Sequence, residues 1–208
     1  MIIHPLDVSF DWKKSKLEDL DFSECTYLEV WHHSCKEKNF SNLPEVPNLK
    51  TIVINFTNTE NLCGLEKYPC LERIELYYCR NMKSLEGIEY LSKKITFFQL
   101  DYAKKLSNFN RIVELENIEN LRYNESREIE NINFILKMKK LRTFCFVNTN
   151  IVDGNLSPLL EHQPKLSFVG FIDKRHYSHK SRYIEEYLGC YKESSAQTTI
   201  ITLDNTDK

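Results

Sequence analysis

The stretch LERIELYYCRNMKSLEGIEYLSKKITFFQLDYAKKL, residues 71–106, holds two copies of one apolar pattern. The first copy has the spacing L-x-x-L-x-L-x-x-C and is formed by Leu71, Ile74, Leu76 and Cys79. The second copy repeats that spacing one unit later in Ile95, Phe98, Leu100 and Ala103. Apolar residues two apart point to the same side of a β-strand, and their neighbours point to the other side. Each unit is therefore predicted to form a strand with one buried face and one exposed face.

The pattern recurs along most of the chain with a period of 22 to 25 residues. The second inward position of each strand falls on Val8, Val30, Ile54, Leu76, Leu100, Tyr123, Phe146 and Phe171. A chain that leaves one strand and returns parallel to it needs a connection of a dozen or more residues. Eight such units predict eight parallel strands stacked into one solenoid. We expect the first unit to be a cap strand with Ile3, Leu6 and Val8 inward.

The segments between the strands are expected to be short and helical. Three-residue spacing predicts 3₁₀ turns on the convex side, in the sets Leu85, Ile88, Leu91 and Leu106, Phe109, Ile112. Residues 126–140 predict a longer helix, because Ile129, Ile132 and Ile135 form an apolar stripe. Ser157 and Pro158 are typical of an N-cap and a first helical turn.

The C-terminal part of the chain departs from the repeat after Asp173. Residues 178–188 predict an amphipathic helix with Gly189 just past its end, which would cap the last repeat. We expect one solenoid domain over residues 1–190 and a polar tail over 191–208. That tail is either disordered or pairs through the strand-prone segment 198–203.

The position that closes each repeat is predicted to hold a small polar side chain. Such a group can turn inward and bond backbone groups where the chain leaves the sheet. His33 and Lys174 are large for this role, and Ala103 has no polar atom to offer. Irregular turns are therefore predicted at these three residues.

Composition limits the classes of function. The chain has 208 residues, 41% hydrophobic and 28% charged, and a formal net charge of −2. It therefore lacks the basic excess expected of a protein that binds nucleic acid or anionic membranes. No apolar run approaches the roughly 20 residues of a membrane span, and no secretory signal is visible. Seven cysteines, an odd number, favour reduced thiols and a cytoplasmic location.

Several units together resemble the leucine-rich repeat proteins of bacteria. The resemblance lies in LKTIVINFT (49–57), LERIELYYC (71–79) and ITFFQLDYA (95–103), with KSLEGIEYL (83–91) and KKLSNFNRI (104–112) after the last two. It covers residues 3–174 and implies an α/β leucine-rich repeat solenoid. In such a fold a concave parallel β-sheet is backed by short helical or 3₁₀ convex segments and a C-terminal capping helix. The resemblance also implies protein binding on the sheet side, with no catalytic residues carried over.

The outward strand positions are the candidate partner-binding site. We expect the main contacts from Tyr27, Glu29, Trp31, Phe56, Glu75, Tyr77, Tyr78, Asp101, Tyr102 and Arg122. Trp and Tyr often dominate binding energy, and exposed rows of aromatic groups are costly unless covered. Glu29, Glu75 and Asp101 favour a basic partner. The alternative is that the aromatic side chains only pack sideways across neighbouring strands.

Other candidate sites have simpler explanations. Cys25, His32, His33 and Cys35 could suggest zinc, but a closed site needs four converging ligands and two of these residues already occupy repeat positions. The basic cluster of Lys174, Arg175, His176, His179, Lys180 and Arg182 is either a solvated face or a contact for an anion or an acidic partner. Cys145 points outward without a histidine beside it, so no catalytic thiol, metal or cofactor is expected.

These observations predict a non-catalytic, cytoplasmic protein-binding module that is a monomer when unbound. Within that class, an inhibitor or immunity-type protein that masks a toxin is one hypothesis. A self-assembling structural solenoid and an enzyme with an unrecognised pocket are the rival interpretations.

Overall fold

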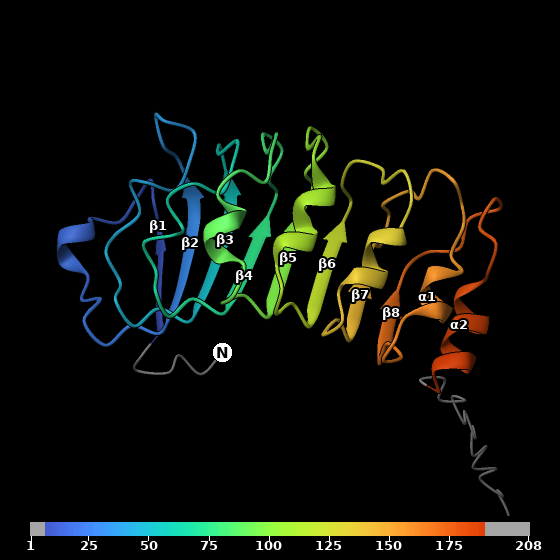
Figure 1. Cartoon of the computed structure of the whole chain (residues 1–208). Coiled ribbons are helices and arrows are strands. Elements are labelled where there is room, and N and C mark those ends of the chain that lie inside the picture. Colours follow the sequence, from blue (N-terminus) through green and yellow to red (C-terminus); the bar gives the residue numbers. More distant parts are fainter. Residues whose placement is uncertain (1–6, 190–208) are drawn as a thin grey trace, which may run out of the picture.

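The computed structural model describes residues 7–189, which form one open sheet of eight parallel strands. The order of the strands in space is their order in the chain (Figure 1). The strands are β1 (Asp7–Asp11), β2 (Tyr27–His33), β3 (Thr51–Thr57), β4 (Arg73–Tyr77), β5 (Phe97–Asp101), β6 (Asn120–Asn124), β7 (Thr143–Cys145) and β8 (Phe168–Gly170). The chain therefore advances by one strand per repeat, an arrangement compatible with a solenoid.

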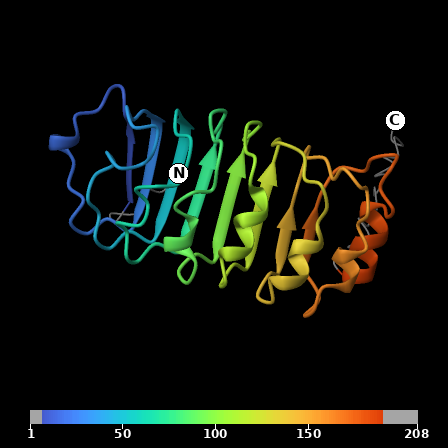
Figure 2. The same ribbon diagram turned by 45° about the horizontal axis from the view of Figure 1, so that its top comes forward.

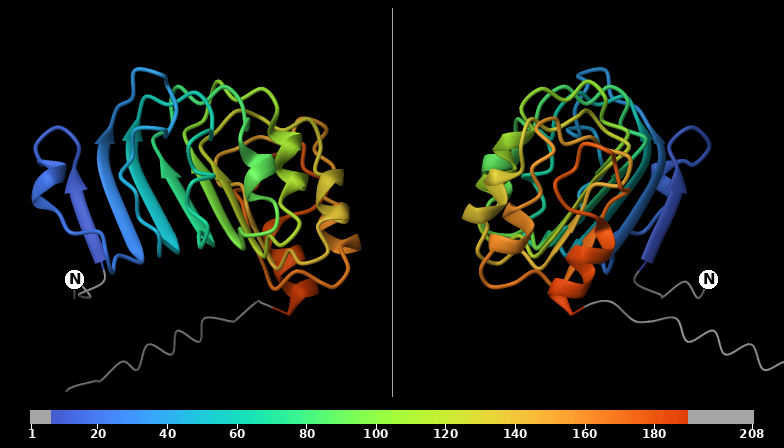
Figure 3. Two further views of the ribbon diagram at one scale, coloured as in Figure 1. Left: turned by 60° about the vertical axis from the view of Figure 1, so that its left-hand side comes forward. Right: turned by 90° about the vertical axis from the view of Figure 1, so that its right-hand side faces the viewer.

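Short helical segments cover the side of the coil opposite the sheet, while the 3₁₀ turn η1 (Leu17–Asp19) and the α-helix α2 (Ser181–Leu188) lie at its two ends, beyond β1 and β8 (Figures 2 and 3). The segments opposite the sheet are the 3₁₀ turns η2 (Ile88–Leu91), η3 (Phe109–Glu114) and η4 (Asn133–Lys137), and the α-helix α1 (Pro158–Glu161). Within residues 7–189, none of these helices has the length and apolar character needed to cross a membrane. The fold is therefore an α/β arrangement in which the sheet predominates.

The predicted in-phase pattern forms the core. Leu28, Ile52, Ile74, Phe98 and Leu121 are successive neighbours across the sheet, and all five are fully buried. Each removes an apolar side chain from water, worth about 1.5–3 kcal/mol for a residue of this size. Because the inward residues of each strand rest on those of the next, one continuous core runs along the whole sheet.

The register of the first strand differs from the prediction. Phe10, not Val8, is the neighbour of Val30, and Val8 pairs instead with Leu28. Phe10 is buried and Val8 only partly so. A shift by two residues keeps the same side chains inward, so the larger Phe10 can fill the inner position without turning the strand over. Ile3 and Leu6 lie outside the described residues.

The helix predicted over 126–140 is shorter than expected and of another type. Ile129 forms a parallel bridge with Ile151, and only Asn133–Lys137 is helical, as the 3₁₀ turn η4. Ile129, Ile132 and Ile135 are three residues apart. At this spacing side chains lie directly above one another on a 3₁₀ helix, whereas on an α-helix they move progressively around the axis. The early part of this segment is extended because Ile129 bonds backbone groups of Asn150 and Val152.

The other predicted helical segments are present. Turns η2 and η3 bury Ile88, Leu91, Phe109 and Ile112. Pro158 opens α1, although the Ser157 side chain makes no capping hydrogen bond. Helix α2 begins at Ser181, three residues later than predicted, and Gly189 ends it with a φ of 75°. The predicted tail, 191–208, lies outside the described residues.

Polar side chains satisfy backbone groups where strands end, as predicted. Ser126 Oγ donates to the carbonyl of Asn124, and Thr149 Oγ1 donates to that of Tyr123. The turn at Ala103 is regular, contrary to the prediction, because Ser126 Oγ of the next repeat accepts its N–H. His33 also fits, since its ring lies within hydrogen-bond distance of Thr57 and Asn42.

Candidate functional site

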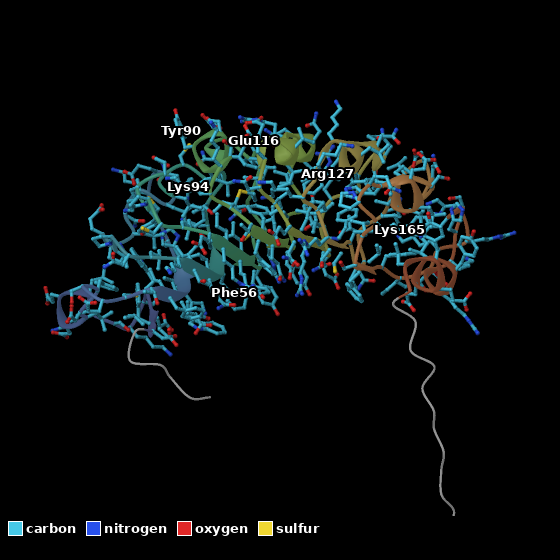
Figure 4. All side chains as sticks on the ribbon, turned by 60° about the horizontal axis from the view of Figure 1, so that its bottom comes forward. Phe56, Tyr90, Lys94, Glu116, Arg127 and Lys165 are labelled. Carbon is cyan, nitrogen blue, oxygen red and sulfur yellow. The ribbon has the colours of Figure 1, made fainter. Side chains whose placement is uncertain are left out.

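The exposed side of the sheet, called the sheet face below, carries rows of side chains that cross neighbouring strands. Phe56 lies on this face (Figure 4). The middle row crosses all eight strands in register and contains Ser9, Glu29, Val53, Glu75, Gln99, Arg122, Cys145 and Gly170. Glu29, Glu75 and Arg122, three of the predicted site residues, therefore lie in one line. Neighbouring strands are about 4.8 Å apart, so this line is roughly 19 Å long.

The predicted acidic side chains are hydrogen-bonded within the sheet face. Glu29 accepts from Ser9 Oγ at 2.8 Å and from Asn55 Nδ2 at 3.0 Å. Asp101 accepts from Gln99 Nε2 at 2.8 Å and from Asn124 Nδ2 at 3.1 Å. Only neutral groups bond these two carboxylates, so their charge is not cancelled by direct contact.

Glu75 has a different environment. Arg73 Nε donates to its Oε1 at 2.6 Å, and the Tyr77 hydroxyl donates to its Oε2 at 2.5 Å. This carboxylate is therefore neutralised by an ion pair inside the face. Of the three acids predicted to favour a basic partner, Glu29 and Asp101 therefore keep a charge that no direct ion pair cancels.

Burial changes the proton affinities on the sheet face. Burial raises the pKa of Asp101 above its ordinary value, and the hydrogen bonds from Gln99 and Asn124 oppose that shift. Burial, followed by the hydrogen bond to Glu75, raises the pKa of Tyr77. Burial also raises the pKa of Tyr27. Both tyrosines therefore stay protonated and present neutral hydroxyl groups.

A stack of rings lies where strands β2 to β5 end. Phe56 and Tyr78 stack at 4.3 Å with 7° between their planes, and Tyr78 and Tyr102 stack at 4.8 Å with 15°. His32 stacks on the free face of Phe56 at 5.4 Å. Three predicted contact residues, Phe56, Tyr78 and Tyr102, thus use their ring faces on one another, as the alternative of sideways packing predicts.

This ring stack rests on an unusual backbone conformation. One residue after the last outward strand position, φ is positive in repeat after repeat: 57° at His32, 61° at Phe56, 57° at Tyr78, 61° at Tyr102, 52° at Glu125 and 55° at Asn148. The left-handed region is uncommon for residues other than glycine. Its recurrence at one position indicates that the repeat geometry imposes it.

Sequence reasoning did not find every residue of this surface. Asp11 Oδ2 lies 3.1 Å from His32 Nδ1 and orients the first ring of the stack. The Arg73 guanidinium lies 3.4 Å from the centre of the Phe97 ring, a cation–π contact between β4 and β5. The stack itself has a sequence signal, because Phe56, Tyr78 and Tyr102 are 22 and 24 residues apart, in step with the repeat.

The side chains considered for zinc contact different groups. His32 contacts Asp11, and His33 contacts Thr57 and Asn42. Cys25 Sγ donates to the carbonyl of Tyr27, and Cys35 Sγ donates to Glu37. Over residues 7–189 no group of three or more potential ligands converges.

The basic cluster near α2 is partly used by local bonds. Lys174 Nζ donates to Asn150 Oδ1 at 2.9 Å, and Lys180 Nζ donates to the carbonyl of Lys174. Arg182 pairs with Glu186 on the same helix. These contacts tie the cap to the last repeats and favour the interpretation as a solvated face.

Cys145 lies in the middle row and is buried. Burial raises the pKa of its thiol, which keeps the sulfur protonated. Reactive cysteines have the opposite shift. The geometry therefore gives this side chain a packing role.

Comparison with models of protein families, with curated proteins and with solved structures found no match. Inference about function therefore depends on the sheet face itself.

Proposed function

We propose that this chain is a leucine-rich repeat solenoid whose sheet face binds another protein. One observation carries the proposal: large apolar side chains remain exposed on a face whose backbone is fixed by strand pairing. They are Trp31, Phe56, Phe168 and Ile172. They form two groups, one on β2 and β3 and one at β8, and exposed apolar groups of this size are typical of interaction sites.

The dimensions of the face support a protein partner. Trp31 on β2 and Phe168 on β8 are six strand spacings apart, roughly 29 Å. A standard protein interface buries about 800 Å² on each partner, which corresponds to a patch of similar width. Because the paired strands are ordered before binding, the free-energy cost of ordering on association is small.

The same properties support an inhibitor or immunity-type protein within this class. A rigid face can cover the functional surface of another protein and needs no chemistry of its own. We also propose a cytoplasmic location, supported by free thiols at all six cysteines in residues 7–189.

Affinity capture from a lysate of the source cells tests the proposal. The wild-type chain, the pair of variants Trp31→Ala and Tyr77→Ala, and Tyr90→Ala are compared as baits. Tyr90 is 62% exposed and lies on η2, away from the sheet (Figure 4). We expect one protein to be captured by wild type and by Tyr90→Ala and lost with both sheet-face variants. Equal capture by all four baits would place the binding site elsewhere.

A further inference from the structure

Arg122 is a charged group of the sheet face that makes no direct hydrogen bond or ion pair with another described residue, although the Asp101 carboxylate is near enough to interact with it electrostatically. It lies in the middle row between Gln99 and Cys145. Within residues 7–189 no ion pair or hydrogen bond to its guanidinium is found, and its Nε is buried without a partner. Its described ring contact is with Phe97, at 5.3 Å. Its terminal nitrogens are therefore free to donate to a bound molecule.

The neighbouring groups make no direct bond to the Arg122 guanidinium. Gln99 is only 5% exposed, and its Nε2 is bound to Asp101 while its Oε1 is buried without a partner. Asp101 is held by two amide groups, and Glu75 is held by Arg73. A protein that covers the face would remove water from the Arg122 guanidinium. That desolvation is unfavourable unless the protein brings an acceptor.

Beyond Arg122 the outward residues of β7 and of 168–172 are uncharged, and the exposed carboxylate of Asp173 follows directly after them. The outward residues of β7 and of the β8 region are Thr143, Cys145, Val147, Phe168, Gly170 and Ile172. Phe168 is 46% exposed and Ile172 51%. Phe171, between Gly170 and Ile172, points inward and stacks on Phe146 at 5.0 Å. A cation without a direct ion pair thus lies on the same sheet as Phe168, with Ile172 just past the end of β8.

We propose that the partner protein inserts a carboxylate against Arg122 and lays an apolar side chain over Gly170, between Phe168 and Ile172. This inference rests on the proposed protein-binding function and specifies the partner's chemistry. A guanidinium presents paired N–H donors that match a carboxylate bidentately. The two strand spacings from β6 to β8 span roughly 10 Å, about three residues of an extended segment. The bound segment therefore carries Asp or Glu and an apolar residue two or three positions apart.

A phage-displayed library of random peptides, selected on the full chain, tests this inference. We expect the selected peptides to share an acidic residue and an apolar residue at that spacing. The peptides should bind Arg122→Gln about 10- to 100-fold more weakly than wild type, because one charge-assisted contact is lost. Their affinity for Arg122→Lys should lie between these two values. Arg127→Gln is the matched control, because Arg127 is an exposed arginine after the end of β6. It should leave affinity unchanged.

A double-mutant cycle distinguishes direct contact from an indirect effect. Replacing the acidic residue of a selected peptide by its amide should weaken binding to wild type but not to Arg122→Gln. Equal losses against both chains would overturn the carboxylate contact. Selection of peptides rich in Lys or Arg that bind Asp101→Asn more weakly than wild type would also overturn the carboxylate contact, in favour of a basic partner.

The outcomes separate this inference from the proposed function. If the affinity of the selected peptides falls with Trp31→Ala but not with Arg122→Gln, the sheet face remains the binding site and the contact at Arg122 is overturned. Peptides insensitive to both substitutions would overturn both. Thermal unfolding of each variant, expected to match wild type, confirms that a loss of affinity is not a loss of fold.

Discussion

Replacing Tyr78 in the ring stack should destabilise the fold by an amount that depends on the substitute. The Tyr78 ring lies between Phe56, at 4.3 Å, and Tyr102, at 4.8 Å. Its backbone has a φ of 57°. The Tyr78 side chain therefore stabilises the fold by stacking on both faces. Its backbone is strained, because the left-handed conformation is more favourable for glycine than for tyrosine.

The magnitude follows from these two contributions. An aromatic pair adds about 0.5–1.5 kcal/mol beyond its buried area, so loss of two pairs in Tyr78→Ala should cost about 1–3 kcal/mol. Glycine relieves left-handed strain of about 1–2 kcal/mol, so Tyr78→Gly should be more stable than Tyr78→Ala by about 1 kcal/mol. Tyr78→Phe keeps both stacks and should match wild type.

Urea unfolding followed by circular dichroism measures these differences as midpoint shifts at constant slope. The expected order of stability is wild type and Tyr78→Phe, then Tyr78→Gly, then Tyr78→Ala. If Tyr78→Ala were as stable as Tyr78→Phe, the ring stack would contribute nothing to the fold. If Tyr78→Gly were the least stable variant, the left-handed backbone would not be strained as argued.

Two further predictions concern the backbone and pH. Gly64→Ala should unfold the chain or lower its free energy of unfolding by more than about 3 kcal/mol, because φ at Gly64 is 99° and an added Cβ would lie 2.4 Å from the backbone of Phe40. At Gly189 an added Cβ meets no atom within 4 Å, so Gly189→Ala should lower the free energy of unfolding by only about 1 kcal/mol. The same urea assay measures both variants. Burial lowers the pKa of His33 in the folded state. In the unfolded chain a histidine has its ordinary pKa of about 6.5, so below that pH the unfolded state binds more protons than the folded state. Stability should therefore fall as the pH drops through about 6.5. Thermal midpoints between neutral and mildly acidic pH should show a smaller acid loss in His33→Gln than in wild type; an equal loss would assign the effect to other groups.

Most of the sheet could be predicted because its cause is local and repeated. Inward residues two apart predict a strand wherever they recur, and the repeat length brings each strand beside the last. The first strand was misaligned because Val8 and Phe10 share the inward side, so alternation alone cannot choose between them. The helix over 126–140 was overestimated because a run of isoleucines at three-residue spacing fits both helix types.

The candidate site was harder to predict, because its groups act through neighbours in other repeats. Nothing in the type of residue marks Tyr78 or Glu125 as left-handed, since this conformation is imposed by the repeat. The pairing of Glu75 with Arg73 and the lack of a partner at Arg122 depend on side-chain geometry that residue types leave open. The exposed Phe168 and Ile172 looked like any other outward residues of the repeat pattern.

Hydroxyl-radical footprinting of the chain with its captured partner tests the central claim, that the sheet face is the binding surface. Trp31 and Phe168 are both solvent-exposed on that face, and Tyr90 on η2 provides an internal reference. If the partner covers the sheet face, oxidation of Trp31 and Phe168 should fall when it binds, while Tyr90 should be oxidised at an unchanged rate. Protection of Tyr90 with unchanged oxidation of Trp31 and Phe168 would contradict that claim.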